Sequence, residues 1–285
     1  MIEASRVYKE LVFGGHLLAL GTASMAATVA FVLDRVPTWD LLLMAYLFSL
    51  GAYTVNRVSD FEQDRISHPG RTVYLEGRRK YLSFVATACF ILGYGMAFFR
   101  NLPFFAALLL PLALAVAYSV GSSRMKGIIG ISRLKEGLLV KNIAISFGWS
   151  LVPVLVGLYY LELPLAIVAL APFIFLRLMV NTIFFDQRDV EADKAFGVST
   201  LPAKLGMAGS TRVIDFLDVA SGAYIIAIVL GGFLPAFAAT LGVFTLYSLT
   251  YRRYAGTGKH YDAARDLAAD GEYILWGVLT YIGHF

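Results

Sequence analysis

Long apolar runs recur along the whole chain, and they restrict its fold more than any other feature. Each run is close to the roughly 20 residues of helix that cross the hydrocarbon core of a bilayer. That core holds no water for backbone amides and carbonyls, so only helices or a closed barrel can span it. The apolar residues do not alternate at period two, and the runs therefore predict helices. Charged residues make up only 15% of the chain, whereas soluble domains carry about 25%.

We expect an all-α polytopic membrane protein with nine transmembrane helices around a cavity open toward the cytoplasmic side. The expected spans cover residues 10–33, 38–57, 81–99, 103–120, 138–159, 164–185, 212–233, 235–250 and 271–284. The first run continues unbroken to Leu33, which indicates a retained span rather than a cleaved signal peptide. The loops between spans are too short for a soluble domain, so residues 1–285 are expected to form a single transmembrane domain.

The basic residues are distributed unevenly between the predicted loops. Except for Arg35, Arg100 and Arg177, every Lys and Arg lies in the N-terminal segment or in or beside a loop that follows an even-numbered span. Cytoplasmic loops are enriched in these residues. The pattern therefore predicts an integral protein of the cell membrane, with the N-terminus and the even-numbered loops in the cytoplasm and the C-terminus on the opposite side. It also explains the net charge of +4 without a nucleic-acid partner, and we expect membrane lipids rather than an obligate protein partner around the chain.

Two acidic motifs end the second and sixth predicted spans, both on the predicted cytoplasmic side. Their members recur at helical spacing: Asn56, Asp60 and Asp64 form the first motif, and Asp186, Asp189 and Asp193 form the second. If each helix continues through its motif, these spacings place the three side chains on one helix face. The repetition resembles the parallel internal repeats of some membrane folds. Ordinary solvated helix ends are the alternative, but two matched motifs on one side favour a shared function.

Crowded carboxylates at a helix C-terminus need a compensating charge. Neighbouring carboxylates raise one another's pKa, and the helix dipole disfavours negative charge at this end. A divalent cation removes both penalties, and Mg²⁺ prefers a few carboxylates together with phosphate oxygens and water. One cysteine and four scattered histidines give no Cys/His site to compete with it. The six motif residues therefore predict Mg²⁺ bridging a diphosphate, with Asp60, Asp64, Asp189 and Asp193 as the catalytic carboxylates.

Basic residues on the same predicted side supply contacts for the rest of the diphosphate charge. Guanidinium and ammonium groups bind phosphate oxygens well, and the candidates are Arg71, Arg124, Lys126, Arg188 and Lys194. For each of them alone, enrichment of basic residues in cytoplasmic loops is the alternative explanation.

A few residues within the spans are also candidates for function. Arg177 lies about two turns inside the sixth span, where a charge is costly and usually faces a cavity. It contacts an anionic substrate, pairs with an Asp, or extends toward the headgroups. Aromatic faces stabilise cations, and aromatic residues in spans near the proposed cavity would do this for an allylic cation, although packing is the alternative for each; they are Tyr53, Tyr118, Phe147 and Trp149.

These features resemble the UbiA-type superfamily of intramembrane prenyltransferases, which has nine transmembrane helices and two Asp-rich motifs. The first motif matches the family's N-x-x-x-D-x-x-x-D in full, and the second matches D-x-x-D-x-x-x-D. After the first motif, the segment from His68 to Thr72 keeps the Pro and Arg of the family's Asn-Pro-x-Arg-Pro. After the fourth span, Tyr118 with Arg124 and Lys126 is similar to the family's Tyr and basic pair, although Ser122 replaces the Lys of some members.

The resemblance implies Mg²⁺-dependent transfer of a prenyl group from an isoprenyl diphosphate to a lipophilic, often aromatic, acceptor. Asn142, beside Lys141 in the fifth span, is a candidate for the acceptor pocket. The sequence leaves the acceptor open between a quinone-type precursor and a glycerol-phosphate lipid, and it leaves the prenyl length open. A secondary transporter is the alternative from another class, but transporter carboxylates usually lie near the middle of the membrane. A lipid-binding scaffold is a third, and it gives no reason for six aligned ligands.

Overall fold

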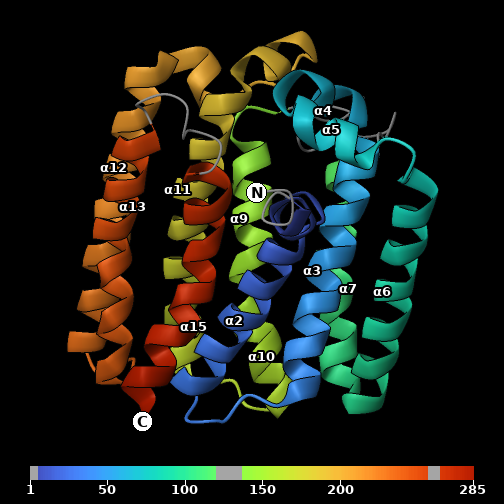
Figure 1. Ribbon diagram of the computed structural model, residues 1–285. Helices are drawn as coiled ribbons and strands as arrows, with labels where there is room; N and C mark the ends of the chain where they lie inside the picture. The colour runs from blue at the N-terminus through green and yellow to red at the C-terminus, as the bar shows by residue number, and fades with distance from the viewer. Residues whose placement is uncertain (1–5, 120–136, 256–263) are drawn as a thin grey trace.

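The computed structural model describes residues 6–119, 137–255 and 264–285, and the elements in these ranges are helices without any strand (Figure 1). In chain order they are η1 (Lys9–Phe13), α2 (His16–Val32), α3 (Trp39–Ser59), α4 (Phe61–Ser67), α5 (Pro69–Leu75), α6 (Arg79–Arg100), α7 (Leu102–Ser119), α9 (Val140–Ser150), α10 (Val152–Tyr160), α11 (Leu165–Ala195), α12 (Leu201–Leu230), η3 (Ala236–Gly242), α13 (Val243–Ala255), η4 (Ala264–Ala269) and α15 (Asp270–His284).

The long helices stand side by side, and the short helices α4 and α5 lie together at one end of the bundle (Figure 1). Helix α2 packs between α3 and α15, while α11 packs against α9 and α12. The shared core is apolar and includes Met25 of α2, Phe173 of α11 and Trp276 of α15, which are all buried. The hydrophobic runs therefore form one bundle whose central helices are α2 and α11.

Each of the nine predicted spans coincides with a helical segment. Among the described residues, five helices are long and apolar enough to cross a membrane, and the bent pair Arg6–Phe13 and His16–Val32 makes a sixth if it counts as one span. The all-α membrane class is confirmed. The count of nine spans, the single domain over residues 1–285 and the side that each end faces stay predictions.

The first predicted span is broken near its start. The chain bends by 57° between Phe13 and His16, and Gly15 adopts a φ of 91°, which favours glycine. Arg57, at the end of α3, donates from its two terminal nitrogens to the carbonyl oxygens of Phe13 (2.7 Å) and Val12 (3.1 Å). These carbonyls end a helix and lack partners within it, so Arg57 stabilises the bend.

The two acidic motifs differ in their backbone. Helix α3 ends at Ser59, and Asp60 has non-helical angles before α4 begins at Phe61. The condition of one continuous helix, under which the first motif would share a single helix face, is therefore not met. In contrast, α11 runs unbroken to Ala195, beyond the predicted end at residue 185, and carries the whole second motif. A helix of 31 residues is about 46 Å long, so it exceeds the hydrocarbon thickness and carries its acidic end out of it.

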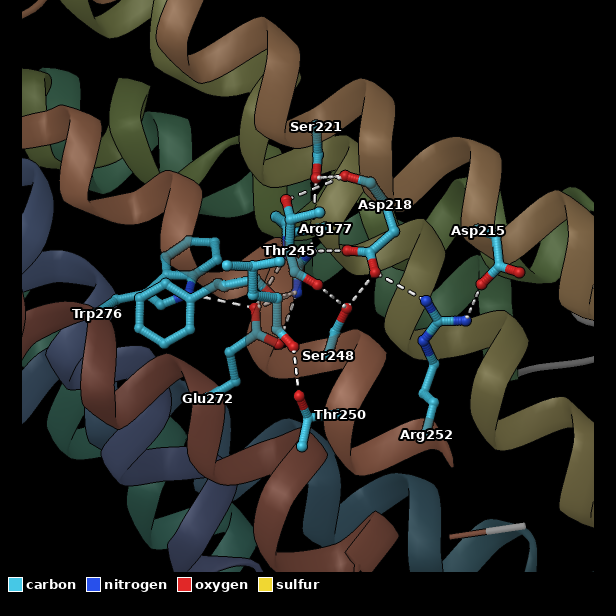
Figure 2. Close-up of polar contacts among 12 residues, drawn as sticks. Arg177, Asp215, Asp218, Ser221, Thr245, Ser248, Thr250, Arg252, Glu272 and Trp276 are labelled. Carbon is cyan, nitrogen blue, oxygen red and sulfur yellow. Dashed lines mark hydrogen bonds and ion pairs between the residues drawn. The ribbon is translucent and has the colours of Figure 1, made fainter. Parts of the chain in front are cut away.

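Arg177 pairs with acidic side chains of other helices, as one of the three alternatives predicted. It is 1% exposed and forms ion pairs with Asp218 of α12 and with Glu272 of α15, the latter at 2.7 Å (Figure 2). Arg252 of α13 extends the cluster by pairing with the second carboxylate oxygen of Asp218 at 2.8 Å, and Ser248 donates to that oxygen as well. We call these residues the Arg177 cluster. It joins α11, α12, α13 and α15, and Arg177 is the cation that Asp218 and Glu272 share.

Candidate active site

The two acidic motifs meet because α4 packs against the end of α11. His68, the residue after α4, places Nε2 3.6 Å from Oδ1 of Asp189. The same nitrogen lies 2.9 Å from a terminal nitrogen of Arg188. Segments more than 100 residues apart thus share one polar region, as the repeated motif predicted.

The first motif holds buried oxygen atoms that lack donors. Asp64 is 7% exposed, and its Oδ1 accepts a 2.6 Å hydrogen bond from Arg71 of α5. Within the described part of the chain, its Oδ2 and the Oδ1 of Asn56 have no hydrogen-bond partner. Burial raises the pKa of Asp64, and the charge of Arg71 only partly opposes this effect. The motif is therefore organised for a further positive charge.

The second motif is neutralised from α9. Lys141 places Nζ 2.7 Å from Oδ1 of Asp186 and 3.7 Å from Oδ1 of Asp193, and both carboxylates are buried. Asn142 donates from Nδ2 to Oδ2 of Asp186 at 2.8 Å, while its own Oδ1 has no partner in the described ranges. Asn142, a predicted acceptor residue, thus contacts the second motif directly. The ammonium group of Lys141 thus supplies the positive charge between two carboxylates.

Arg188 links the second motif to both ends of the chain. Its Nε lies 3.0 Å from Oδ1 of Asp189, and one terminal nitrogen lies 3.2 Å from Oδ1 of Asp266 in η4. The hydroxyl of Tyr8 donates to the other oxygen of Asp266 at 2.8 Å. Arg188 therefore lies at the predicted site, and Asp266 and Tyr8 are additional members that the sequence did not reveal.

Sequence reasoning missed His68 as well, although it begins the segment with Pro69 and Arg71 that resembles a family element. Nothing in the sequence distinguishes Asp266 from other loop carboxylates. Of the remaining predicted residues, Lys194 is exposed on α11, and Tyr118 lies near the end of α7, where the side chains are not described. Arg124 and Lys126 lie outside the described residues.

The residues fit a hard cation, although they do not converge on a single point. In the described ranges, no three His, Cys, Asp or Glu side chains form a group that could hold one ion. The motif carboxylates instead contact Arg71, Lys141 and Arg188. The oxygens without donors on Asn56 and Asp64 are the kind that Mg²⁺ prefers, so a metal would complete the site by taking over contacts from these side chains.

An apolar cavity of about 290 Å³ begins beside the first motif. Asn56 lines one end of it, and its walls come from α2, α3, α6, α7, α9 and α10. Tyr53 and Trp149, two of the aromatic residues singled out in the sequence, line it near Asn56, and their ring centroids lie 6.4 Å apart. Phe147 is 44% exposed and is not part of the wall. A polar, oxygen-rich site thus opens onto space for a hydrophobic chain.

The fold and the site define a class of helical membrane protein in which two Asp motifs meet beside an apolar cavity. The sequence matches the UbiA prenyltransferase family over residues 17–273, so the chain belongs to this family. The prediction of a membrane-embedded prenyltransferase, acting on an isoprenyl diphosphate and a lipophilic acceptor, is confirmed at this level, and the transporter alternative is wrong.

Two relatives of this chain bear the same enzyme name. Digeranylgeranylglyceryl phosphate synthase from Methanoculleus marisnigri is 26% identical over 217 residues, which cover 72% of this chain and 68% of the relative. The enzyme of the same name from Methanopyrus kandleri is 30% identical over 186 residues, covering 62% of this chain and 61% of the relative.

Solved structures show the same fold at low sequence identity. A UbiA homologue from Archaeoglobus fulgidus bound to GPP and Mg²⁺ has a TM-score of 0.66 at 16% identity, covering 94% of this chain and 98% of that one. An apo UbiA homologue from Aeropyrum pernix K1 has a TM-score of 0.64 at 18% identity, covering 94% and 96%.

Proposed function

We propose that this prenyltransferase binds Mg²⁺ and the diphosphate of its donor between the two acidic motifs, and that the prenyl chain extends into the apolar cavity. The proposed ligands of the metal are Asn56, Asp60, Asp64, Asp186, Asp189 and Asp193. The observation that carries the proposal is the packing of α4 against α11, with His68 beside Asp189, next to a cavity that Asn56 lines. When bound, Mg²⁺ supplies Lewis-acid stabilisation of the charge on the leaving diphosphate.

The basic side chains of the site have two roles in this proposal. Arg71 and Lys141 neutralise Asp64 and Asp186. If those carboxylates held Mg²⁺, the same guanidinium and ammonium groups would be available for diphosphate oxygens. Arg188 stays tied to Asp189 and Asp266 and keeps the second motif in place. The predicted contacts of Lys194, Tyr118, Arg124 and Lys126 with the donor remain part of the proposal.

The reaction takes place where the polar site meets the cavity. The C1–O bond of the allylic diphosphate breaks with its electron pair on the diphosphate. The nucleophile of the acceptor forms the new bond to C1 and loses its proton to the departing diphosphate. Tyr53 and Trp149 lie at this end of the cavity, where aromatic faces stabilise positive charge developing at C1.

A glycerol-phosphate lipid is the acceptor that we propose, and geranylgeranyl diphosphate is the proposed donor. Both follow from the name of the two relatives, digeranylgeranylglyceryl phosphate synthase. Prenylation of a quinone-type precursor, the other acceptor expected from the sequence, is the competing outcome of the test.

The test combines donors and acceptors with the purified enzyme in detergent. Geranylgeranyl diphosphate is offered with geranylgeranylglyceryl phosphate or with an aromatic quinone precursor, each with Mg²⁺ and with a chelator. We expect Mg²⁺-dependent product with the glycerol lipid alone. Product with the aromatic acceptor alone would contradict the proposed glycerol-lipid acceptor. Full activity in the presence of chelator would contradict the proposed requirement for Mg²⁺.

The orientation is also part of the proposal. The distribution of Lys and Arg supports a cytoplasmic site and N-terminus, with the C-terminus on the opposite side. Trp39 (87% exposed) begins α3, and the first motif lies at the opposite end of that helix. In intact cells, a membrane-impermeant thiol reagent should label Trp39→Cys and not Lys194→Cys; the reverse pattern would contradict the orientation.

A further inference from the structure

We infer that one face of α3 sets the maximum length of the prenyl chain, with geranylgeranyl as the longest group that fits. The inference rests on the proposed function, because it requires the donor diphosphate to lie beside Asn56.

The cavity follows α3 for most of the length of that helix. The residues of α3 that line it include Asn56, Ala52, Ser49, Ala45 and Leu41. They recur at intervals of three or four, so they occupy one helix face. Ala52, Ser49 and Ala45 are small and leave room for a chain beside the helix. The other two lining residues of α3, Tyr53 and Phe48, are large, and the ring of Phe48 packs against Tyr94 of α6 at a centroid distance of 4.8 Å. Ser49 is 7% exposed, and its buried Oγ has no hydrogen-bond partner within the described ranges.

We expect buried side chains around Leu41 to close the far end of the cavity. Leu41, Phe104 and Val156 line it there and are 3%, 3% and 2% exposed. The ring of Phe104 packs edge-on against Tyr159 at a centroid distance of 5.7 Å. Tyr159 in turn donates a 2.7 Å hydrogen bond to Oδ2 of Asp40. We call Leu41, Phe104 and Val156 the cavity floor, and the hydrogen bond behind it keeps it from yielding to a longer chain.

The depth of the cavity corresponds to a particular chain. A helical rise of about 1.5 Å per residue places Ala52, Ser49, Ala45 and Leu41 about 6, 10, 16 and 22 Å from Asn56 along the axis. An extended carbon chain with bonds of about 1.5 Å advances about 1.25 Å per bond. On this scale geranyl, farnesyl and geranylgeranyl chains reach about 9, 14 and 19 Å, and the next longer chain reaches about 24 Å. Geranylgeranyl therefore fits above Leu41, whereas the next chain meets the floor.

Substitutions at increasing depth test this directly. Ser49→Phe should limit the enzyme to donors no longer than geranyl diphosphate, and Ala45→Phe to donors no longer than farnesyl diphosphate. Phe104→Ala should open the floor and admit the next longer donor. Ala113→Phe and Phe99→Ala serve as matched controls, since both residues are exposed on the outside of the bundle and should leave the length profile unchanged.

The measurement is kcat/KM for a series of allylic diphosphates from geranyl upward, with one acceptor at saturation. For Ala45→Phe we expect at least a tenfold loss with geranylgeranyl diphosphate and less than a threefold change with geranyl diphosphate. Retained turnover of the short donor shows that the variant is folded and that the proposed function holds. Equal losses for all donors, or an unchanged profile in both Ser49→Phe and Ala45→Phe, would overturn the inference. If the wild type turns over none of the donors, the proposed function itself fails instead.

Discussion

Two buried clusters of charged residues differ in whether their side-chain oxygens accept hydrogen bonds. In the Arg177 cluster, both oxygens of Asp218 and both oxygens of Glu272 accept hydrogen bonds (Figure 2). The indole nitrogen of Trp276 donates to Glu272 as well, at 3.3 Å. At the acidic motifs, Asp64 Oδ2 and Asn56 Oδ1 are buried with no donor in the described ranges.

This difference distinguishes buried charges that stabilise the fold from buried charges that bind a ligand. A buried ion pair is tolerated when hydrogen bonds satisfy its remaining atoms. The two carboxylates of the Arg177 cluster meet that condition while the cluster joins four helices, and among its charged atoms Nε of Arg252 has no partner in the described ranges. Buried oxygens without donors are costly and need an explanation such as an ion. We therefore expect changes in the Arg177 cluster to affect stability and changes in the motifs to affect ligand binding.

The largest effect is expected from Arg177→Met. Removing the guanidinium leaves Asp218 and Glu272 buried without their shared cation, and breaking a buried pair costs about 3–5 kcal/mol. The thermal midpoint of unfolding in detergent should fall strongly, while kcat per folded molecule stays near the wild-type value. Arg253→Met, an exposed neighbour of the cluster, is the control and should unfold like the wild type. A normal midpoint with lost activity would place Arg177 in the site.

Asp189→Asn should show the reverse behaviour. Loss of one charge that stabilises the transition state typically reduces kcat by about 10²–10³-fold. The thermal midpoint without ligand should change little, because the amide keeps the shape and a hydrogen-bond acceptor for Arg188. Glu191→Gln, which changes an exposed residue of the same helix, is the control. Turnover within threefold of the wild type would remove Asp189 from the mechanism.

A smaller effect is expected from pH. Burial raises the pKa of Asp64, so this carboxyl keeps its proton at pH values where an exposed Asp is ionised, and a metal ion must displace it. The affinity for Mg²⁺ should therefore fall as the pH is lowered through the raised pKa. We expect the stabilisation of the wild type by Mg²⁺ to weaken as the pH falls from roughly 8 to 5. Thermal unfolding with and without Mg²⁺ measures this stabilisation at each pH. Asp64→Asn should bind less Mg²⁺ throughout and lack this part of the pH dependence; an identical profile in both would contradict the assignment.

The smallest effect is expected from Asp266→Asn. The amide oxygen can still accept from Arg188, but the amide nitrogen can only donate to the Tyr8 hydroxyl, which donates to Asp266 in the wild type. Altering such outer partners costs about tenfold. KM for the prenyl diphosphate should rise by about this factor with kcat nearly unchanged. Asp266→Ala should be worse than Asp266→Asn. A pure loss of kcat would instead point to a direct part in the reaction.

The sequence predicts the helices and the motifs well, because long apolar segments and helical spacing depend on local chemistry. It does not predict which helices become neighbours. The ion-pair partners of Arg177 come from α12 and α15, and Asp266 reaches Arg188 from η4. The sequence also does not predict the helix break at Asp60, because no proline or glycine lies next to it. Cavity depth also depends on packing between helices that are distant in sequence.

The most direct test of the account is a double-mutant cycle on Asp60 and Asp189, one residue from each motif. The quantity measured by calorimetry is the Mg²⁺-dependent affinity for a geranylgeranyl thiolodiphosphate, a donor analogue with sulfur at the bridging position. If both motifs hold one metal–diphosphate group, each single Asn variant should weaken binding strongly, and the double variant should be little worse than either one. If the two losses simply add, as they do for independent sites, or if either single variant binds like the wild type, the shared site is contradicted.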